Sequence, residues 1–277
     1  MAGCLFLVGT PLGNLEDITL RALKTLKEVD LIAAEDTRHT RKLLSHYGIT
    51  TPLTSYHRHN QETKGEVLLR LLLEGKQIAL VTDAGMPGIA DPGEALVRQA
   101  AEAGVEVAVV PGPSAVIAAL AVSGLSTRRF LFEGFLPRKR GERKERLEDL
   151  AAEERTLVFY EAPHRLVETL EDMVEVFGGQ RRVAVGRELT KKFETVLRSS
   201  LEGALDHFRR EAPRGEVTLV VEGASPCRPA MVPREAALLV EALEKAGRPR
   251  REALAAVARF YGRPRREIYQ VCLEGET

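Results

Sequence analysis

QIALVTDAGMPGIADPG, residues 77–93, joins an apolar strand to a loop of glycine and proline and then to a helix. Asp91 is suited to cap that helix, Pro92 to its first position, and Glu94 to a capping box. Two similar loops follow other apolar runs, GTPLGN at 9–14 and PGPSA at 111–115. Such loops at the carboxyl ends of strands offer bare backbone to a ligand. Three of them together predict one composite binding pocket.

The first 122 residues alternate between apolar runs and helical stretches. This alternation predicts an α/β fold with an open parallel sheet, and the uninterrupted apolar runs indicate strands that are covered on both faces. The expected strands are 5–8, 31–34, 78–82 and 105–110, and the expected helices are 19–28, 38–46, 62–74, 92–103 and 113–122.

The pattern changes after SGLSTRR at 123–129, because strands then follow one another more directly, which predicts a mixed sheet. Its expected strands are 130–133, 157–160, 183–187, 195–199 and 217–222, with helices at 143–152, 165–177 and 201–211. A break at 223–229 precedes a stretch that looks helical, with turns at 247–249 and 262–264. We therefore expect three parts: an α/β domain at 1–122, a second α/β domain at 123–224, and a small helical basic tail at 225–277.

Bulk composition excludes several classes of protein. The chain has 277 residues with 40 basic and 40 acidic side chains, so no global charge indicates a nucleic-acid or membrane partner. No apolar stretch is long enough for a membrane span, and the N-terminus lacks the features of a signal peptide. Cys4, Cys227 and Cys272 are odd in number and far apart, which favours reduced thiols in the cytoplasm and predicts no metal site.

The glycine loops also restrict the ligand. GTPLGN lacks the third glycine of a dinucleotide fingerprint, and the chain has no P-loop Gly-Lys-Ser/Thr. The pocket is therefore expected to favour a ligand without phosphates. Each loop taken alone is better explained as a turn that serves only the backbone.

Two basic stretches stand out against the neutral total charge. PRKRGERKER at 137–146 holds six basic residues and two acidic ones, and residues 248–266 hold seven arginines against Glu252. Both predict a polyanion partner, although a charge run is commonly only a solvated surface. The RNA-binding residues that we expect in the first stretch are Arg138, Lys139, Arg140, Arg143 and Lys144. Phe135 could stack on a base or belong to the core.

Six motifs, in order, resemble those of the ribosomal RNA small subunit methyltransferase I family, which belongs to the tetrapyrrole-methylase superfamily. They are GTPLGNLEDIT at 9–19, AEDTR at 34–38, DAGMPGIADPG at 83–93, PGPSA at 111–115, FYEAPHR at 159–165 and RELTK at 187–191. The resemblance covers residues 1–222 and, more loosely, the tail. It implies a two-domain fold with S-adenosylmethionine (SAM) in the cleft, a cytidine 2′-hydroxyl of small-subunit (16S) ribosomal RNA as methyl acceptor, and a homodimer.

The resemblance also implies which residues contact the donor. They are Leu12, the loop from Asp83 to Ala90 with Gly85, Met86, Pro87 and Ile89, then Ser114, Ala115, Ala162, Glu188 and Leu189. Many superfamily members carry Gly-Asp-Pro in the central loop, whereas this chain has Gly85-Met86-Pro87 with Asp83 displaced. Contacts from the backbone of this loop are compatible with that difference.

The residue that removes the proton from the acceptor is left open by the sequence. Asp36 ends a strand but could instead cap the next helix. His57 could titrate near neutrality, although a lone loop histidine is usually structural. Lys191 lies in a polar cluster with Glu194, and Glu161, His164 and Arg165 form another. We list Asp36, His57 and Lys191 as the catalytic candidates.

The function that we expect is SAM-dependent 2′-O-methylation of a cytidine in 16S ribosomal RNA, acting on the RNA or on the small subunit. One alternative is a methylase of a tetrapyrrole or a modified protein side chain on the same fold, because a fold does not determine a substrate. Another is an RNA-binding assembly factor that holds SAM without transferring its methyl group.

Overall fold

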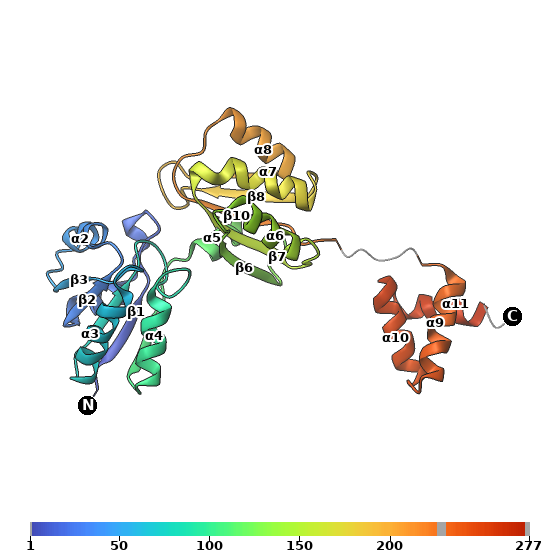
Figure 1. Cartoon of the computed structure of the whole chain (residues 1–277), viewed down its shortest axis with the longest axis horizontal. Helices are drawn as coiled ribbons and strands as arrows, with labels where there is room; N and C mark the ends of the chain where they lie inside the picture. Colours follow the sequence, from blue (N-terminus) through green and yellow to red (C-terminus); the bar gives the residue numbers. More distant parts are fainter. Residues whose placement is uncertain (1, 226–230, 275–277) are drawn as a thin grey trace. The chain divides into compact units, whose positions relative to one another are not determined.

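The computed structural model describes residues 2–225 and 231–274, and Cys227 lies outside these ranges. Internal contacts divide the chain into two units, Met1–Gly223 and Ala224–Thr277. The first unit contains two five-stranded sheets with covering helices, and the described part of the second contains three helices (Figure 1). No helix within the described residues is long and apolar enough to cross a membrane.

The first sheet is parallel throughout, as predicted. Its strands, in spatial order, are β3 (Leu53–Ser55), β2 (Leu31–Ala34), β4 (Ile78–Val81), β1 (Cys4–Val8) and β5 (Glu106–Val110). Helices α1 (Leu20–Glu28) and α2 (Thr37–His46) pack on one face, and α3 (Gln61–Leu73) and α4 (Gly93–Glu102) pack on the other. Because both faces are covered, the central strand β4 is buried along its whole length.

The edge strand β3 was not among the predicted strands. Two of its three residues, Thr54 and Ser55, are polar, so the segment has no apolar run, and all three residues are only partly buried. Pairing with β2, where Ala33 lies opposite Thr54, makes this segment a strand.

The strand order places a crevice between β2 and β4. The chain leaves β2 toward β3 on one side and leaves β4 toward β5 on the other. Ligands of open α/β sheets bind where the connections of neighbouring strands diverge in this way, at the carboxyl ends of the strands. The topology therefore points to the segments directly after β2 and β4.

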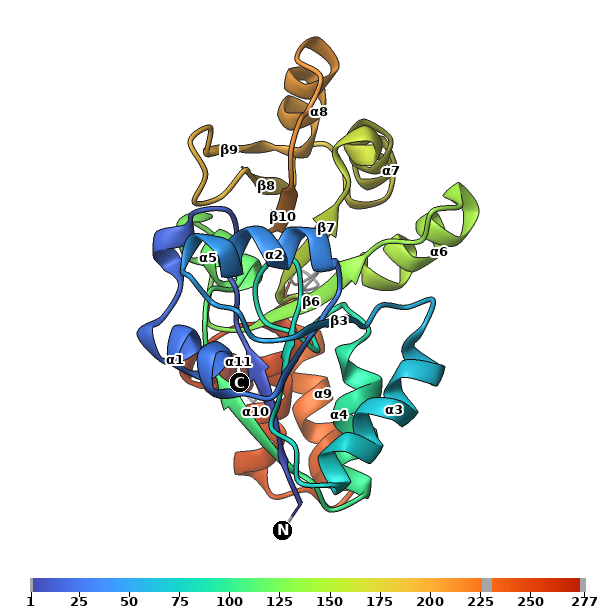
Figure 2. The ribbon, with the colours of Figure 1, turned by 90° about the vertical axis from the view of Figure 1, so that its left-hand side faces the viewer.

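The second sheet is mixed, also as predicted. Its order is β6 (Phe130–Phe135), β7 (Thr156–Glu161), β10 (Val217–Val221), β8 (Arg182–Arg187) and β9 (Thr195–Ser200). Strands β6 and β7 are parallel, and the other neighbours are antiparallel. Helices α6 (Arg140–Leu150), α7 (Leu166–Phe177) and α8 (Leu201–Arg210) share one apolar core with this sheet (Figure 2).

The other face of the second sheet is covered by α5 (Ala115–Val122), which directly follows the first sheet in the chain. Val116, Ala119 and Leu120 of this helix pack with Val158 of β7 and Val220 of β10. The predicted boundary at 122/123 thus follows a helix that belongs to the core of the second sheet. The division into separately folding domains stays a prediction.

The second unit has its own small core. Helices α9 (Pro233–Lys245), α10 (Arg250–Tyr261) and α11 (Arg265–Glu274) enclose buried Val240, Leu254 and Ile268. Gly262 adopts the left-handed conformation that ends α10, with a φ of 62°. The turns lie where the sequence predicted them.

Two glycines bring the first and third predicted loops into direct backbone contact. A Cβ on Gly112 would lie 2.9 Å from the Cα of Gly9, and a Cβ on Gly9 would lie 2.7 Å from the Cα of Gly112. Backbone cannot approach backbone this closely past a side chain, so both positions require glycine.

We expect Gly112→Ala to lower the free energy of unfolding by about 1–3 kcal/mol, because the added methyl group overpacks this contact. The matched control is Gly141→Ala in α6, where a Cβ would meet no atom of the described residues within 4 Å. This control should leave stability unchanged or raise it by about 0.4–1 kcal/mol. Urea denaturation measures both, and equal stability of the two variants would contradict the proposed backbone contact.

Candidate functional site

A cavity of about 390 Å³ opens at the carboxyl ends of the first sheet. This volume falls within the roughly 300–1,000 Å³ typical of small-molecule sites. The first sheet contributes the segments after β1, β2, β4 and β5, and the second contributes β6, β7 and β10. The lining residues are Leu12, Glu35, Thr82, Asp83, Ala84, Gly85, Met86, Ile89, Ala90, Asp91, Ser114, Ala115, Phe135, Tyr160, Glu161, Ala162, Pro163, Glu216, Val217 and Thr218.

Hydrogen bonds join the loops that form the cavity floor. Thr10 and Gly85 pair through both backbone groups, with N···O distances of 2.9 and 3.1 Å. The Thr10 hydroxyl also donates to the Thr82 carbonyl at 3.1 Å. The first and central loops are therefore one connected structure, as the prediction of a composite pocket requires.

Asp91 shapes the central loop. Its carboxylate accepts from the backbone N–H of Gly93 at 2.7 Å, at the start of α4, and also from Gly88 and Ile89. The helix begins at Gly93 with Pro92 as its N-cap, so the expectation that Asp91 caps it and that Pro92 takes its first position is wrong by one residue. Asp91 instead folds the loop back on itself through these backbone contacts. Ala90 between these contacts has a φ of 63°, a strained conformation for a residue with a Cβ.

Two hydrogen bonds cross the crevice between β2 and β4. The Thr82 hydroxyl donates to Oε2 of Glu35 at 2.5 Å, and the Asp36 N–H donates to Oδ1 of Asp83 at 3.0 Å. This arrangement brings two cavity-lining carboxylates together. Burial raises the pKa of Asp83, and the nearby charge of Glu35 adds to the increase.

Most of the predicted donor-contact residues line this cavity. They are Leu12, Asp83, Gly85, Met86, Ile89, Ala90, Ser114, Ala115 and Ala162. Pro87, Glu188 and Leu189 do not belong to the lining. Leu189 is buried beside α5, and the Glu188 carboxylate accepts from the Glu216 N–H at 2.9 Å.

None of the three predicted catalytic residues lines the cavity. Asp36 caps α2, the alternative that the sequence left open, and the guanidinium of Arg38 holds its pKa well below the usual range. The backbone N–H of His57 bonds to the Asn60 side chain, and its ring Nδ1 is buried without a hydrogen-bond partner in the described structure.

Lys191 connects the two sheets of the first unit. Its aliphatic chain packs on Gly13, where an added Cβ would lie 2.4 Å from it. Its ammonium pairs with Glu188 at 3.0 Å and Glu216 at 3.3 Å. Burial disfavours the charge, but these ion pairs outweigh burial and raise the pKa of Lys191. A protonated lysine cannot accept a proton, so this geometry opposes a role as general base.

The five predicted RNA-binding residues differ in accessibility. Arg143 is buried, with 2 % of its side chain exposed, and pairs with buried Asp172 at 2.7 Å. Its expected contact with RNA conflicts with this burial. Arg140 also pairs with Asp172, Lys144 with Glu175, and Lys139 with Glu142. The exposed Arg138 side chain has no hydrogen bond or ion pair within the described residues.

Several cavity residues were not predicted, among them Glu35, Thr82, Phe135, Tyr160 and Thr218. Glu35 adjoins Asp36 in AEDTR, and Tyr160 adjoins Glu161 in FYEAPHR, so their motifs gave the position along the chain. The sequence does not show that Glu35 rather than Asp36 faces the cavity, nor that both Tyr160 and Glu161 do, and only the structure supplies that.

Comparison with known proteins identifies relatives along the whole chain. Residues 4–205 match the model of the Tetrapyrrole (Corrin/Porphyrin) Methylases. The chain is 50% identical to the ribosomal RNA small subunit methyltransferase I of Synechocystis sp., covering 99% of both chains. It is 49% identical to the protein of that name from Halalkalibacterium halodurans, covering 97% of this chain and 94% of the relative.

The fold also has counterparts among solved structures. The uroporphyrin-III-C-methyltransferase of Thermus thermophilus superposes with a TM-score of 0.57 at 24% identity. The match covers 79% of this chain and 94% of that one. At this level of identity the similarity establishes the arrangement of the sheets and helices.

The pKa shifts of Asp83 and Asp36 predict opposite effects on stability. A carboxylate whose pKa is raised by folding opposes folding when charged, so its contribution to stability falls as the pH rises through that pKa. We expect Asp83→Asn to raise the melting temperature at pH 7, because asparagine retains an acceptor for the Asp36 N–H. The gain should disappear as the pH falls below the ordinary carboxyl range.

Asp36→Asn is the control of opposite sign, because folding lowers the pKa of Asp36. Asparagine caps helices as well as aspartate does, so the variant loses mainly the pairing with Arg38. Its melting temperature should be lower at pH 7, and the deficit should shrink progressively as the pH falls below the ordinary carboxyl range toward pH 3. Calorimetry from pH 3 to 8 measures both, and shifts of the same sign would contradict these assignments.

Proposed function

The chain belongs to the ribosomal RNA small subunit methyltransferase I family of the tetrapyrrole methylases, and we propose that it methylates the ribose 2′-oxygen of a cytidine in 16S ribosomal RNA with SAM as donor. Family membership makes it a SAM-dependent ribosomal RNA methyltransferase. The atom and the nucleotide are the part that we propose.

The cavity is the observation that supports SAM as the methyl donor in this proposal, and the acceptor atom and nucleotide rest on the family resemblance. Its carboxylates suit a cationic donor, since SAM carries an electrophilic methyl group on a positively charged sulfur when bound. Glu35 and Asp83 place negative charge at one end, while Leu12, Met86 and Ala115 give an apolar wall. The loops have no lysine or arginine that could bind a phosphate. The residues that line the cavity therefore suit SAM better than a ligand with a nucleotide phosphate.

Catalysis by alignment fits these surroundings. Methyl transfer needs the acceptor oxygen in line with the methyl group and the removal of one proton. Asp91 and Glu161 are unsuited to take that proton, because neighbouring N–H, hydroxyl or guanidinium groups occupy both of their oxygens. Glu35 has Thr82 on one oxygen, and its other oxygen has no hydrogen bond within the described residues. Asp83 also keeps one oxygen without a hydrogen bond within the described residues. Of these two neighbouring carboxylates we assign the proton to Glu35, in preference to Asp36, His57 or Lys191, none of which lines the cavity.

Two further parts of the proposal concern assembly and location. Val109 on the edge strand β5 and Ile117 on α5 are more than half exposed, and such apolar side chains favour association of two copies as a homodimer. We propose a cytoplasmic location, since the small subunits that would serve as substrate are found there.

The product identifies the acceptor atom. Incubation with SAM and small subunits from a strain lacking the activity, followed by digestion and mass spectrometry, should place the added methyl group on the ribose of a cytidine. The modified linkage should resist alkali, because the 2′-oxygen is the internal nucleophile of RNA cleavage. A methyl group on a base, a protein or a tetrapyrrole would refute the proposal, and SAM binding without transfer would favour an assembly factor.

Replacement of the proposed base should reduce turnover selectively. We expect Glu35→Gln to lower kcat by about 10²-fold or more, the contribution typical of general-base catalysis, while the Thr82 hydroxyl keeps an acceptor. Asp36→Asn serves as the adjacent control and should retain turnover within a few-fold. Single-turnover kinetics with SAM binding measured by calorimetry separates chemistry from affinity. Near-normal turnover in Glu35→Gln would exclude this assignment.

A further inference from the structure

Strand β6 carries a bulge that changes the direction of one aromatic side chain. Phe132 pairs with Val158, but Gly134 pairs with Phe159, so Glu133 is an extra residue in the strand. Gly134 accommodates the bulge with a φ of 68°. Residues three apart in a regular strand face opposite sides, yet the rings of Phe132 and Phe135 both contact Tyr160. The bulge therefore places Phe135 in the wall of the cavity.

Phe135 is an aromatic surface that remains open to solvent. Its side chain is 57% exposed, and its ring centroid lies 5.5 Å from that of Tyr160. Both residues line the cavity. Exposed aromatic rings beside a basic segment are typical of sites where unpaired nucleic-acid bases stack.

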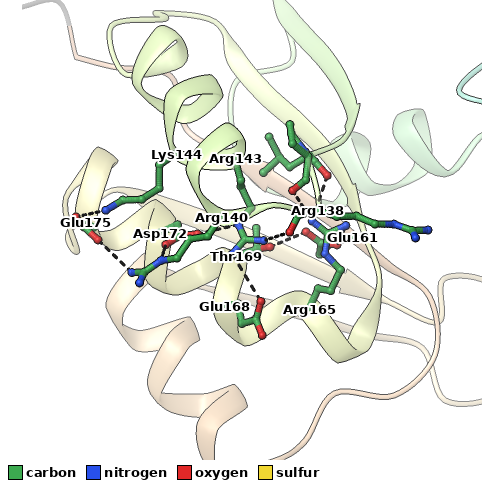
Figure 3. Close-up of polar contacts among 12 residues, drawn as sticks. Arg138, Arg140, Arg143, Lys144, Glu161, Arg165, Glu168, Thr169, Asp172 and Glu175 are labelled. Carbon is green, nitrogen blue, oxygen red and sulfur yellow. Dashed lines mark hydrogen bonds and ion pairs between the residues drawn. The ribbon is translucent and has the colours of Figure 1, made fainter.

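The segment after Phe135 is held by two guanidinium groups (Figure 3). Arg165 donates to the carbonyls of Leu136 and Pro137 at 3.1 and 2.8 Å. Arg143 donates from Nη1 to the next carbonyl oxygen, that of Arg138, at 3.3 Å. Three successive carbonyls are thus fixed by side chains from α6 and the turn before α7.

Buried carboxylates hold these two arginines in turn. Asp172 accepts from Arg143 at 2.7 Å, and Glu161 lies 3.5 Å from Arg165. Thr169 donates to the second oxygen of Glu161 at 2.6 Å, and Glu161 itself lines the cavity. We call Arg143, Arg165, Asp172 and Glu161 the guanidinium clamp. It connects the cavity wall directly to the start of the basic segment.

Arg138 is the cation that the clamp leaves available. Figure 3 shows its side chain pointing away from the cluster, and it is exposed. It follows Phe135 by three residues, so the two Cα atoms lie within about 11 Å even if the chain is fully extended. A phosphate and its base can be contacted together over such a distance.

We propose that Phe135, Tyr160 and Arg138 form a subsite for one unpaired nucleotide of the RNA, beside the nucleotide that receives the methyl group. The base stacks on Phe135, whose ring packs against that of Tyr160, and Arg138 binds a backbone phosphate. The guanidinium clamp positions this subsite without touching the RNA. This inference rests on the proposed function, because it assumes an RNA substrate.

The test compares substitutions that remove or keep one property. Phe135→Leu should weaken binding of fluorescein-labelled octacytidylate, measured by anisotropy, between about 5-fold and 150-fold, and Phe135→Tyr should restore it. Arg138→Gln should lower the slope of log affinity against log salt by about 0.7, the value for one phosphate contact on a single strand. Arg21→Gln, another exposed arginine outside the cavity lining, should change neither quantity.

The clamp is tested by Arg165→Lys, which keeps the charge but loses the planar donor that binds two carbonyls. A positioning role predicts a raised KM for small subunits, with kcat, SAM affinity and salt slope unchanged. A general structural role would instead lower the melting temperature, kcat and SAM affinity together, and would overturn the clamp.

Failure of the subsite and failure of the function give different results. Equal octacytidylate affinity in the parent, Phe135→Leu and Arg138→Gln would overturn the subsite, whether or not turnover is seen. Absence of methyl transfer by the parent chain to small subunits would overturn the proposed function. The octacytidylate affinities of the parent and the variants would still decide whether the subsite binds a nucleotide.

Discussion

The contact between Gly9 and Gly112 is the constraint on which the rest of the site depends. It sets the distance between the loops that follow β1 and β5, and the backbone pair of Thr10 with Gly85 then fixes the loop after β4. Helix α5 begins directly after the third loop, so its first residues face the cavity. A site built from backbone contacts explains why these loops consist so largely of glycine and proline.

The same residue type serves different purposes around this cavity because its neighbours differ. Asp91 folds a loop, and Glu161 belongs to a buried network that ends at the basic segment. Glu35 and Asp83 each keep one oxygen clear of hydrogen bonds within the described residues. Hydrogen-bond occupancy, rather than charge alone, therefore distinguishes structural carboxylates from those available to a ligand.

Sequence patterns could predict the sheets because buried parallel strands require continuous apolar runs, as in IALV of β4. They could not predict β3, which is short, lies at an edge and has no such run. The three loops followed from their motifs, and the family resemblance supplied nine of the twenty residues that line the cavity. The partner of Arg143 could not be predicted, because Asp172 lies 29 residues away on another helix and a run of charge does not reveal which member is buried. The sequence also could not show that the side chain of Glu35, rather than that of Asp36, lines the cavity.

Helix α5 has a consequence for motion. Its N-cap Ser114 and its first residue Ala115 line the cavity, while Val116, Ala119 and Leu120 are packed into the core of the second sheet. Any rotation of the second sheet relative to the first must be absorbed by the backbone just before this helix, since the helix travels with the second sheet. That backbone includes Gly112, which is in close backbone contact with Gly9. The hinge and the binding site are therefore the same few residues, so a ligand held there stiffens the joint between the two sheets.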